Sequence, residues 1–371
     1  MNEIFLRTNK CEYKPGDDIY GVVYLKIASA TGGRGVRLKF LGCEKFVYEY
    51  KNAVLTDSDS QKFEECRHHV SYNETLFESD EPLYIRSTLI PFKISLPSEI
   101  PGTFEACNET EVVRWHASMK FSLEVSVIDA EYLKIVQAIM VFEALSQRLC
   151  KANIPEAVSV SYRRTLAILF TSQINVTARL FEHTNRSAEN LQLRIIISNN
   201  TNKAVKSLKI KLLRYIHLLG KWREMITPCE DARVMRNGDR VEIAVESGES
   251  VIREQLLDME HFQQGVDNIQ IPLRGCDNTP LPPTVNGHHI QCWYEVQLEV
   301  TLSNDDKVDL KVPVAVIWPP KNKEWGKWKC PQWVAKEALN IDIYHTTSVL
   351  RVPQNLLSSP AFSSIPGFNP T

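Results

Sequence analysis

One long stretch of the chain alternates between apolar and polar side chains, and this pattern constrains the fold more than any other feature. From Val113 to Val127 every second residue is apolar, and Arg114, His116 and Lys120 are among the polar residues between them. Successive side chains of a strand point to opposite faces, so the pattern predicts a strand with one buried face. A strand this long is typical of a large sandwich, where it serves two neighbours.

A second alternating stretch, Leu191 to Tyr215, predicts a β-hairpin. Leu191 to Ile197 and Leu208 to Leu212 both have the two-residue period of a half-buried strand. The polar connection between them runs from Asn199 to Lys203, and asparagine tolerates the left-handed backbone of tight turns. We therefore expect the two strands to pair with each other.

Further short strands, separated by turn residues, occur on both sides of a break in the pattern from about Leu145 to Glu156. The segment from Asp57 to Asp80 is the least strand-like part of the first half and is interpreted as a long excursion. Two sets of strands predict an all-β fold of two tandem antiparallel, immunoglobulin-like β-sandwiches. The expected divisions are a first sandwich at 1–147, a linker at 148–157, a second sandwich at 158–320, and a partly disordered C-terminal tail at 321–371.

Composition narrows the class of protein. The 371 residues carry a net charge of −2, so the molecule as a whole has no field that would attract nucleic acid. No apolar run is long enough for a spanning helix, and the N-terminus lacks a secretory pattern. The nine cysteines are scattered and never form a C-x-x-C pair, which favours reduced thiols in a cytosolic protein.

The sequence predicts no enzyme and no cofactor. It has no P-loop, no nucleophile elbow, no dinucleotide-binding glycine motif and no H-E-x-x-H helix. Two clusters contain metal-ligating residue types: Cys66 with His68 and His69, and Cys292 with the His288-His289 pair. Neither has the paired spacing of a zinc site, so no metal site is predicted.

Several segments, in order along the chain, carry a family resemblance. In the first half these are Tyr13 to Asp17 with the strand after it, Val36 to Gly42, Phe92 to Pro101, and Val113 to Trp115. They resemble the α-arrestins (arrestin domain-containing proteins), and Ser198 to Ile210 in the second half is similar to the corresponding hairpin of the β-arrestins. The resemblance spans about Tyr13 to Pro320 and implies the arrestin fold of two joined sandwiches.

The resemblance also implies a function. Arrestins are non-catalytic adaptors that hold the cytoplasmic tails or loops of membrane receptors and transporters and recruit trafficking or ubiquitination machinery. Many α-arrestins contact ubiquitin ligases through P-P-x-Y motifs. Neither Pro282-Pro283 nor Pro319-Pro320 is followed by the tyrosine, so that route lacks its motif here. We expect a cytoplasmic protein, recruited peripherally to the plasma membrane or endosomes, that acts in endocytosis, endosomal sorting or signalling.

Three groups of residues are candidate sites. Lys206, Lys209 and Lys211 could bind the phosphates of an inositol lipid headgroup, as the β-arrestins do at this hairpin, or they could be an ordinary solvated sheet face. Leu213 stands where the β-arrestins have a further basic residue, and Arg214 is displaced by one position. The alternation would therefore turn Arg214 to the other face.

The other two groups are a short motif and a set of charges. Residues 256–260 fit a clathrin box, or their leucines could simply pack in the core; the residues concerned are Leu256, Leu257, Met259 and Glu260. Asp17 or Asp18 could form a buried polar core with Arg163 or Arg164, or all four could be exposed charges of turns and strands. The alternative function is that of a retromer-type arrestin-fold subunit of an endosomal sorting coat.

Overall fold

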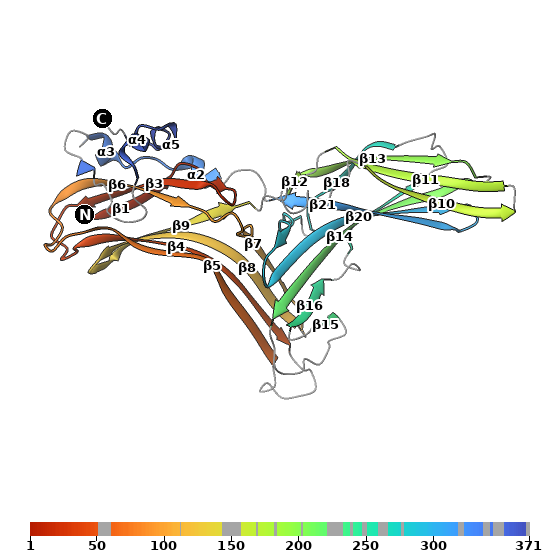
Figure 1. Ribbon diagram of the computed structural model, residues 1–371, viewed down its shortest axis with the longest axis horizontal. Coiled ribbons are helices and arrows are strands. Elements are labelled where there is room, and N and C mark those ends of the chain that lie inside the picture. Colours follow the sequence, from red (N-terminus) through yellow and green to blue (C-terminus); the bar gives the residue numbers. More distant parts are fainter. Residues whose placement is uncertain are drawn as a thin grey trace.

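The computed structural model describes residues 1–50, 61–111, 113–142, 157–167, 170–181, 184–201, 203–220, 233–237, 240–246, 251–258, 266–275, 278–317, 323–336, 342–343 and 352–368. These residues form two β-sandwiches, one from each half of the chain, and a C-terminal segment that returns to the first sandwich (Figure 1). The all-β prediction is confirmed.

The first sandwich consists of a four-stranded and a six-stranded sheet. The smaller sheet has the order β1 (Glu3–Thr8), β3 (Asp18–Ile27), β6 (Arg86–Ser95) and β22 (Asp342–Ile343). The larger has the order β2 (Glu12–Tyr13), β9 (Ala130–Val141), β8 (Val113–Ile128), β4 (Gly35–Tyr50) and β5 (Gln61–Glu78), with β7 (Phe104–Glu109) paired to β8. The alternating stretch that predicted the fold is β8, and its apolar residues are buried as expected.

The second sandwich consists of a four-stranded and an eight-stranded sheet. The smaller sheet has the order β10 (Ala157–Ala167), β11 (Phe170–Leu180), β13 (Asn190–Asn199) and β18 (Val266–Pro272). The larger has the order β12 (Thr184–Arg186), β21 (Lys307–Ile317), β20 (Ile290–Leu302), β14 (Val205–Gly220), β16 (Arg240–Glu246) and β15 (Arg233–Asn237). In addition, β17 (Val251–Asp258) pairs with β14, and β19 (Val285–Asn286) pairs with β20.

The expected hairpin is wrong, because its two strands belong to different sheets. β13 pairs with β11 and β18, whereas β14 pairs with β20, β17 and β16. The Asn199 side chain accepts a hydrogen bond from the backbone N–H of Thr201 at 3.0 Å, and this turn carries the chain from one layer to the other. Both strands alternate because both bury one face, and that pattern does not say which strand is the neighbour.

The expected excursion at Asp57 to Asp80 is also wrong for its described part. Residues from Gln61 onward form β5, which pairs with β4 along its whole length and ends the order of its sheet. Glu64, Cys66, Arg67 and His68 are exposed or half-exposed, so both faces of its middle are polar and the two-residue period is hidden.

The C-terminal segment covers the outer face of the smaller sheet of the first sandwich (Figure 1). Its described residues include the short helices α2 (Lys323–Lys327), α3 (Gln332–Lys336), α4 (Gln354–Leu357) and α5 (Pro360–Ser363). Phe362, Ile365 and Phe368 are buried in a cluster with Val22 and Tyr24 of β3. Residues 352–368 are Pro- and Ser-rich, but their few apolar side chains pack on one apolar surface.

Candidate functional site

The junction between the two sandwiches is built around a buried carboxylate, Glu44 of β4. The buried face of β4 carries Phe40, Glu44, Phe46 and Tyr48 in phase, so one charged side chain replaces an apolar one in the pattern. The far halves of β4, β5 and β8 extend past the first sandwich toward the second (Figure 1). Glu44 therefore meets the other domain with its side chain fully shielded from solvent.

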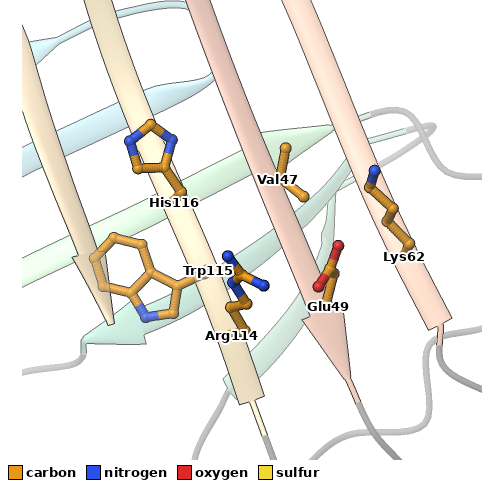
Figure 2. A pocket seen from close by; sticks show the side chains of 6 residues that line it. All are labelled: Val47, Glu49, Lys62, Arg114, Trp115 and His116. Carbon is orange, nitrogen blue, oxygen red and sulfur yellow. The ribbon is translucent and has the colours of Figure 1, made fainter. Parts of the chain in front are cut away.

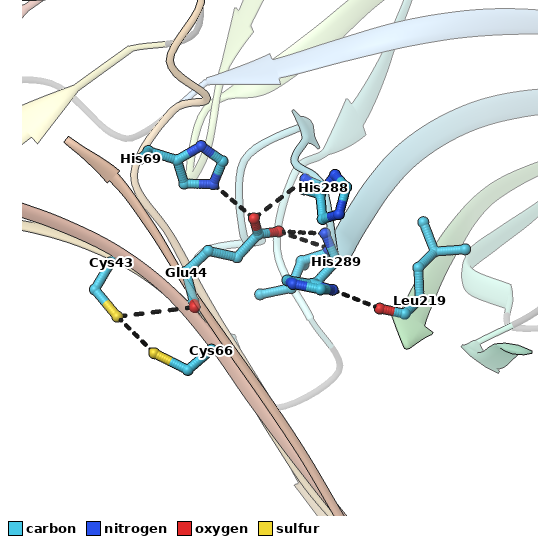
Figure 3. A network of polar contacts seen from close by, with 8 residues as sticks. Cys43, Glu44, Cys66, His69, Leu219, His288 and His289 are labelled. Carbon is cyan, nitrogen blue, oxygen red and sulfur yellow. Dashed lines mark hydrogen bonds and ion pairs between the residues drawn. The ribbon is translucent and has the colours of Figure 1, made fainter. Parts of the chain in front are cut away.

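Three consecutive backbone N–H groups of the second domain converge on Glu44 (Figure 3). The amides of His289 and Ile290 donate to Oε1 at 2.8 Å each, and the amide of His288 donates to Oε2 at 3.1 Å. Successive N–H groups of this kind form a concave anion-binding nest. Here the nest is filled by a carboxylate of the same chain.

His69 of β5 completes the junction, and a β-bulge places it there. Its Nε2 lies 2.6 Å from Glu44 Oε2. The β4–β5 register passes from Gly42 opposite Val70 to Cys43 opposite His68, so His69 is the extra residue of the bulge. The bulge turns His69 toward Glu44, while His68 remains on the exposed side of the sheet. On the second domain, His289 Nδ1 is 2.8 Å from the carbonyl of Leu219.

The electrostatics of Glu44 are set by two opposing influences. Burial, the largest single influence, raises its pKa, but the hydrogen bonds from His69, His289 and Ile290 together outweigh it. The pKa of Glu44 therefore lies below its usual value, and the group is an anion at neutral pH. We call Glu44, His69 and the backbone of His288, His289 and Ile290 the junction latch.

A hollow of about 320 Å³ lies on the outer face of the larger sheet of the first sandwich (Figure 2). Its lining residues come from three adjacent strands and are Val47, Glu49, Lys62, Arg114, Trp115 and His116. One carboxylate faces two cations and an imidazole there, without a serine or cysteine nucleophile among the lining side chains.

The three candidate lysines lie on the outer face of the larger sheet of the second domain. Lys206 Nζ pairs with Asp305 at 3.0 Å, and Lys209 lies opposite Glu299 in the β14–β20 register. Lys211 lies opposite Gln297, one step further along. Lys307 also pairs with Glu299 at 2.8 Å. The face is therefore a mixture of basic and acidic groups, which lowers its net positive charge.

The candidate clathrin box lies partly on β17 of the second domain. The backbone of Leu256 and Leu257 pairs with Lys209 and Leu208 inside the sheet, while Met259 and Glu260 lie outside the described residues. The clathrin box stays a prediction.

The two candidate aspartates have partners within the first sandwich. Asp17 accepts a hydrogen bond from the backbone of Lys14 at 3.0 Å, and Asp18 pairs with Lys93 at 2.9 Å. Arg163 and Arg164 lie on β10 of the second domain, where only the backbone is described. The polar core stays a prediction.

The two metal-like clusters of the sequence are rearranged in the structure. In the first, His69 faces Glu44, away from Cys66 and His68. In the second, Cys292 is buried in the core of the second sandwich. A residue far away in sequence, Cys43, lies beside Cys66 and His68 instead. No spacing rule in the sequence connects Cys43 with them.

The fold and junction define a class of protein in which two β-sandwiches are held together in one chain. Residues 172–321 match the family model for the arrestin (or S-antigen) C-terminal domain. This match supports membership of the arrestin family. A comparison with curated proteins found no match. In the described part of the chain, no helix has the length and apolar character needed to cross a membrane.

Proposed function

We propose that this chain is a non-catalytic adaptor that binds cytoplasmic tails or loops of membrane receptors or transporters. It links them to endocytic, endosomal-sorting or signalling machinery, and it acts in the cytoplasm with peripheral recruitment to the plasma membrane or endosomes. The observation that carries the proposal is the arrestin C-terminal domain joined to a second sandwich through a built junction. An adaptor needs broad recognition surfaces in a fixed arrangement, and the junction latch supplies the fixed arrangement.

Proximity labelling in cells tests this function. The labelling enzyme is fused to the full chain, and the expected result is enrichment of membrane proteins with cytoplasmic segments together with coat, ligase or signalling proteins. A Glu44→Ala variant is expected to lose part of this set because the two sandwiches are no longer held together. Glu131→Ala, at an exposed position on β9 of the first sandwich, is the matched control. A labelled set made of soluble enzymes alone would contradict the proposal.

The lysines on the second domain could add contact with a phosphoinositide headgroup, by attraction between ammonium and phosphate groups. Double charge reversal of Lys209 and Lys211 is expected to weaken binding to phosphoinositide-containing vesicles. Charge reversal of Lys120, exposed on the first domain, is the control. If the double variant floats with the vesicles as well as the natural chain does, the headgroup proposal is wrong. The adaptor proposal does not depend on this result.

Clathrin recruitment through Leu256 and Leu257 requires β17 to leave its sheet, since the backbone of both residues is paired. A pull-down with the clathrin terminal domain, comparing the natural chain with Leu257→Ala, tests this route. Recruitment of ubiquitin ligases would need a contact other than P-P-x-Y. The alternative function, a retromer-type subunit of a sorting coat, predicts stable co-purification with a helical-solenoid partner through gel filtration.

A further inference from the structure

Three metal-ligating side chains meet on the exposed side of the β4–β5 strand pair, next to the junction latch. Figure 3 shows two of them, Cys43 and Cys66. Cys43 comes from β4, and Cys66 and His68 come from β5. Cys43 lies directly opposite His68 in the register, so both side chains project from the same face. Cys66 is two residues from His68 and shares that face.

The distances between the donor atoms suit a single ion. The two Sγ atoms are 3.3 Å apart, and the three ligand atoms all lie within 4.8 Å of one another. Zinc–sulfur bonds of about 2.3 Å place two thiolates on a tetrahedral ion roughly 3.8 Å apart. A small side-chain rotation therefore converts the observed pair into a ligating one.

The chemistry of the donor set selects the metal. Thiolates favour Zn²⁺ over the harder cations Mg²⁺ and Ca²⁺, and a neutral imidazole is a common partner ligand. Two thiolates neutralise the charge of the ion. The nearby cation Lys45 already pairs with Glu64 at 2.5 Å, so its charge is largely balanced. We propose that Cys43, Cys66 and His68 bind a Zn²⁺ ion as three protein ligands, with the fourth position open to solvent.

The position of the site links it to the arrangement of the domains. The ion would tie β4 to β5 on one side of the sheet at the bulge that, on the other side, turns His69 toward Glu44. Metal binding would thus hold the register on which the junction latch depends. A ligand that binds only the folded state also raises its stability by mass action.

Cobalt titration of the full chain tests the proposal. Co²⁺ replaces Zn²⁺ at such sites and reports thiolate ligands by a sulfur-to-cobalt charge-transfer band. With the protein kept reduced by a phosphine, one equivalent of Co²⁺ is expected to saturate the band, and Zn²⁺ is expected to remove it. Cys43→Ser and Cys66→Ser should each lower the band by about half and weaken binding more than about tenfold. His68→Gln should keep the band and weaken binding.

Cys107→Ser is the matched control, since Cys107 is an exposed thiol on β7 of the same sheet. Circular dichroism shows whether each variant is folded, and Co²⁺ binding by His68→Gln keeps the test open if a serine variant fails to fold. A band that is absent, or that persists unchanged in both serine variants, would overturn the proposal. So would mass spectrometry showing that Cys43 and Cys66 form a disulfide under the same reducing conditions and bind no metal.

Discussion

The first sandwich is contacted twice, once by the second domain and once by the C-terminal segment. Hydrogen bonds to a buried carboxylate stabilise the first contact, and apolar packing stabilises the second. At the junction latch one buried carboxylate receives three backbone N–H groups and an imidazole. Under the C-terminal segment, aromatic and aliphatic side chains pack on β3, with Phe362 fully buried and edge-on to Tyr20 at 5.3 Å. The polar contact depends on the directions of a few hydrogen bonds, whereas the apolar contact depends on the area of apolar surface that it buries.

The C-terminal segment also covers a cation. Arg7 of β1 is buried, its Nη1 donates to the carbonyl of Trp325 at 2.7 Å, and its guanidinium lies 3.5 Å from the centre of the Trp325 ring. Burial lowers the pKa of Arg7. The aromatic face and the carbonyl partly compensate for lost hydration. Even the mainly apolar contact therefore includes a charged side chain at its edge.

The largest effect is expected from Glu44→Ala, which removes the acceptor of the amides of His288, His289 and Ile290. Breaking a buried ionic contact by removing one partner costs about 3–5 kcal/mol. The free energy of unfolding from urea titration measures the loss. The control is Glu49→Ala, on the other side of the same strand. An equal loss in its free energy of unfolding would show that the lost stability does not come from the junction latch.

Phe362→Ala is expected to cost about 3 kcal/mol, because it opens a cavity between α5 and β3. The loss should appear as faster cleavage of the C-terminal segment in limited proteolysis, while the core of both sandwiches stays protected. Ser363→Ala, at an exposed neighbouring position, serves as the control. Equal protection of the segment in the Phe362 variant would mean that the apolar contact is not what holds it.

Gly287→Ala is expected to weaken the latch by about 2 kcal/mol through overpacking. A Cβ at this position would meet Glu44 Oε1 and would lie 2.9 Å from the carbonyl of Ile290. Gly326→Ala is a fitting comparison, because nothing lies within 4 Å of a Cβ built there. Urea titration of both variants separates a steric effect at the latch from a general effect of replacing glycine.

Tyr24→Phe is expected to cost about 1 kcal/mol, the net value of one hydrogen bond. The Tyr24 hydroxyl donates to the carbonyl of Pro366 at 2.5 Å, and this is a polar tie within the apolar contact. Hydrogen exchange at residues 352–368 measures the effect. An unchanged exchange rate would show that the Tyr24 ring holds the C-terminal segment without the help of its hydroxyl.

The smallest change near neutrality is expected from pH. The folded-state pKa of Glu44 is lowered from 4.5, so its contribution is fully present above that value and is lost as the pH falls through the folded-state pKa. Other carboxylates with lowered pKa values, including Glu105 and Glu299, act in the same direction. The informative quantity is therefore the difference between the natural chain and Glu44→Gln in acid unfolding. Identical acid-unfolding midpoints for the natural chain and Glu44→Gln would show that Glu44 does not contribute to the pH dependence of stability.

The strands that bury one face could be predicted from the sequence, but their partners could not. The alternation at Val113 to Val127 and at Cys292 to Leu302 corresponds to β8 and β20. The same kind of pattern around Asn199 led to a false hairpin, because two strands facing one core alternate alike whether or not they pair. β5 was missed because an edge strand with two polar faces has no apolar period.

The candidate sites were harder to predict for a related reason. Glu44 has one recognisable feature in the sequence: it is a charged residue on the same alternating face as Phe40, Phe46 and Tyr48. This position indicates a buried polar group but does not identify its partner. The approach of Cys43 to Cys66 depends on a register shift at a bulge, and no local pattern encodes it. Lys206, Lys209 and Lys211 stand out in the sequence as a basic cluster in a segment that resembles the β-arrestins. Glu299, the acidic residue opposite Lys209, comes from a strand far away in sequence.

The length of β4 has a mechanical consequence. Its backbone is hydrogen-bonded to β5 on one side and to β8 on the other from Gly35 to Tyr50, so the three strands form a continuous beam from one sandwich to the other. A pull along these strands would load many hydrogen bonds in shear at the same time, instead of opening them one after another. Tension applied where β4, β5 and β8 extend past the first sandwich would therefore reach Glu44 with little stretching of the sheet in between.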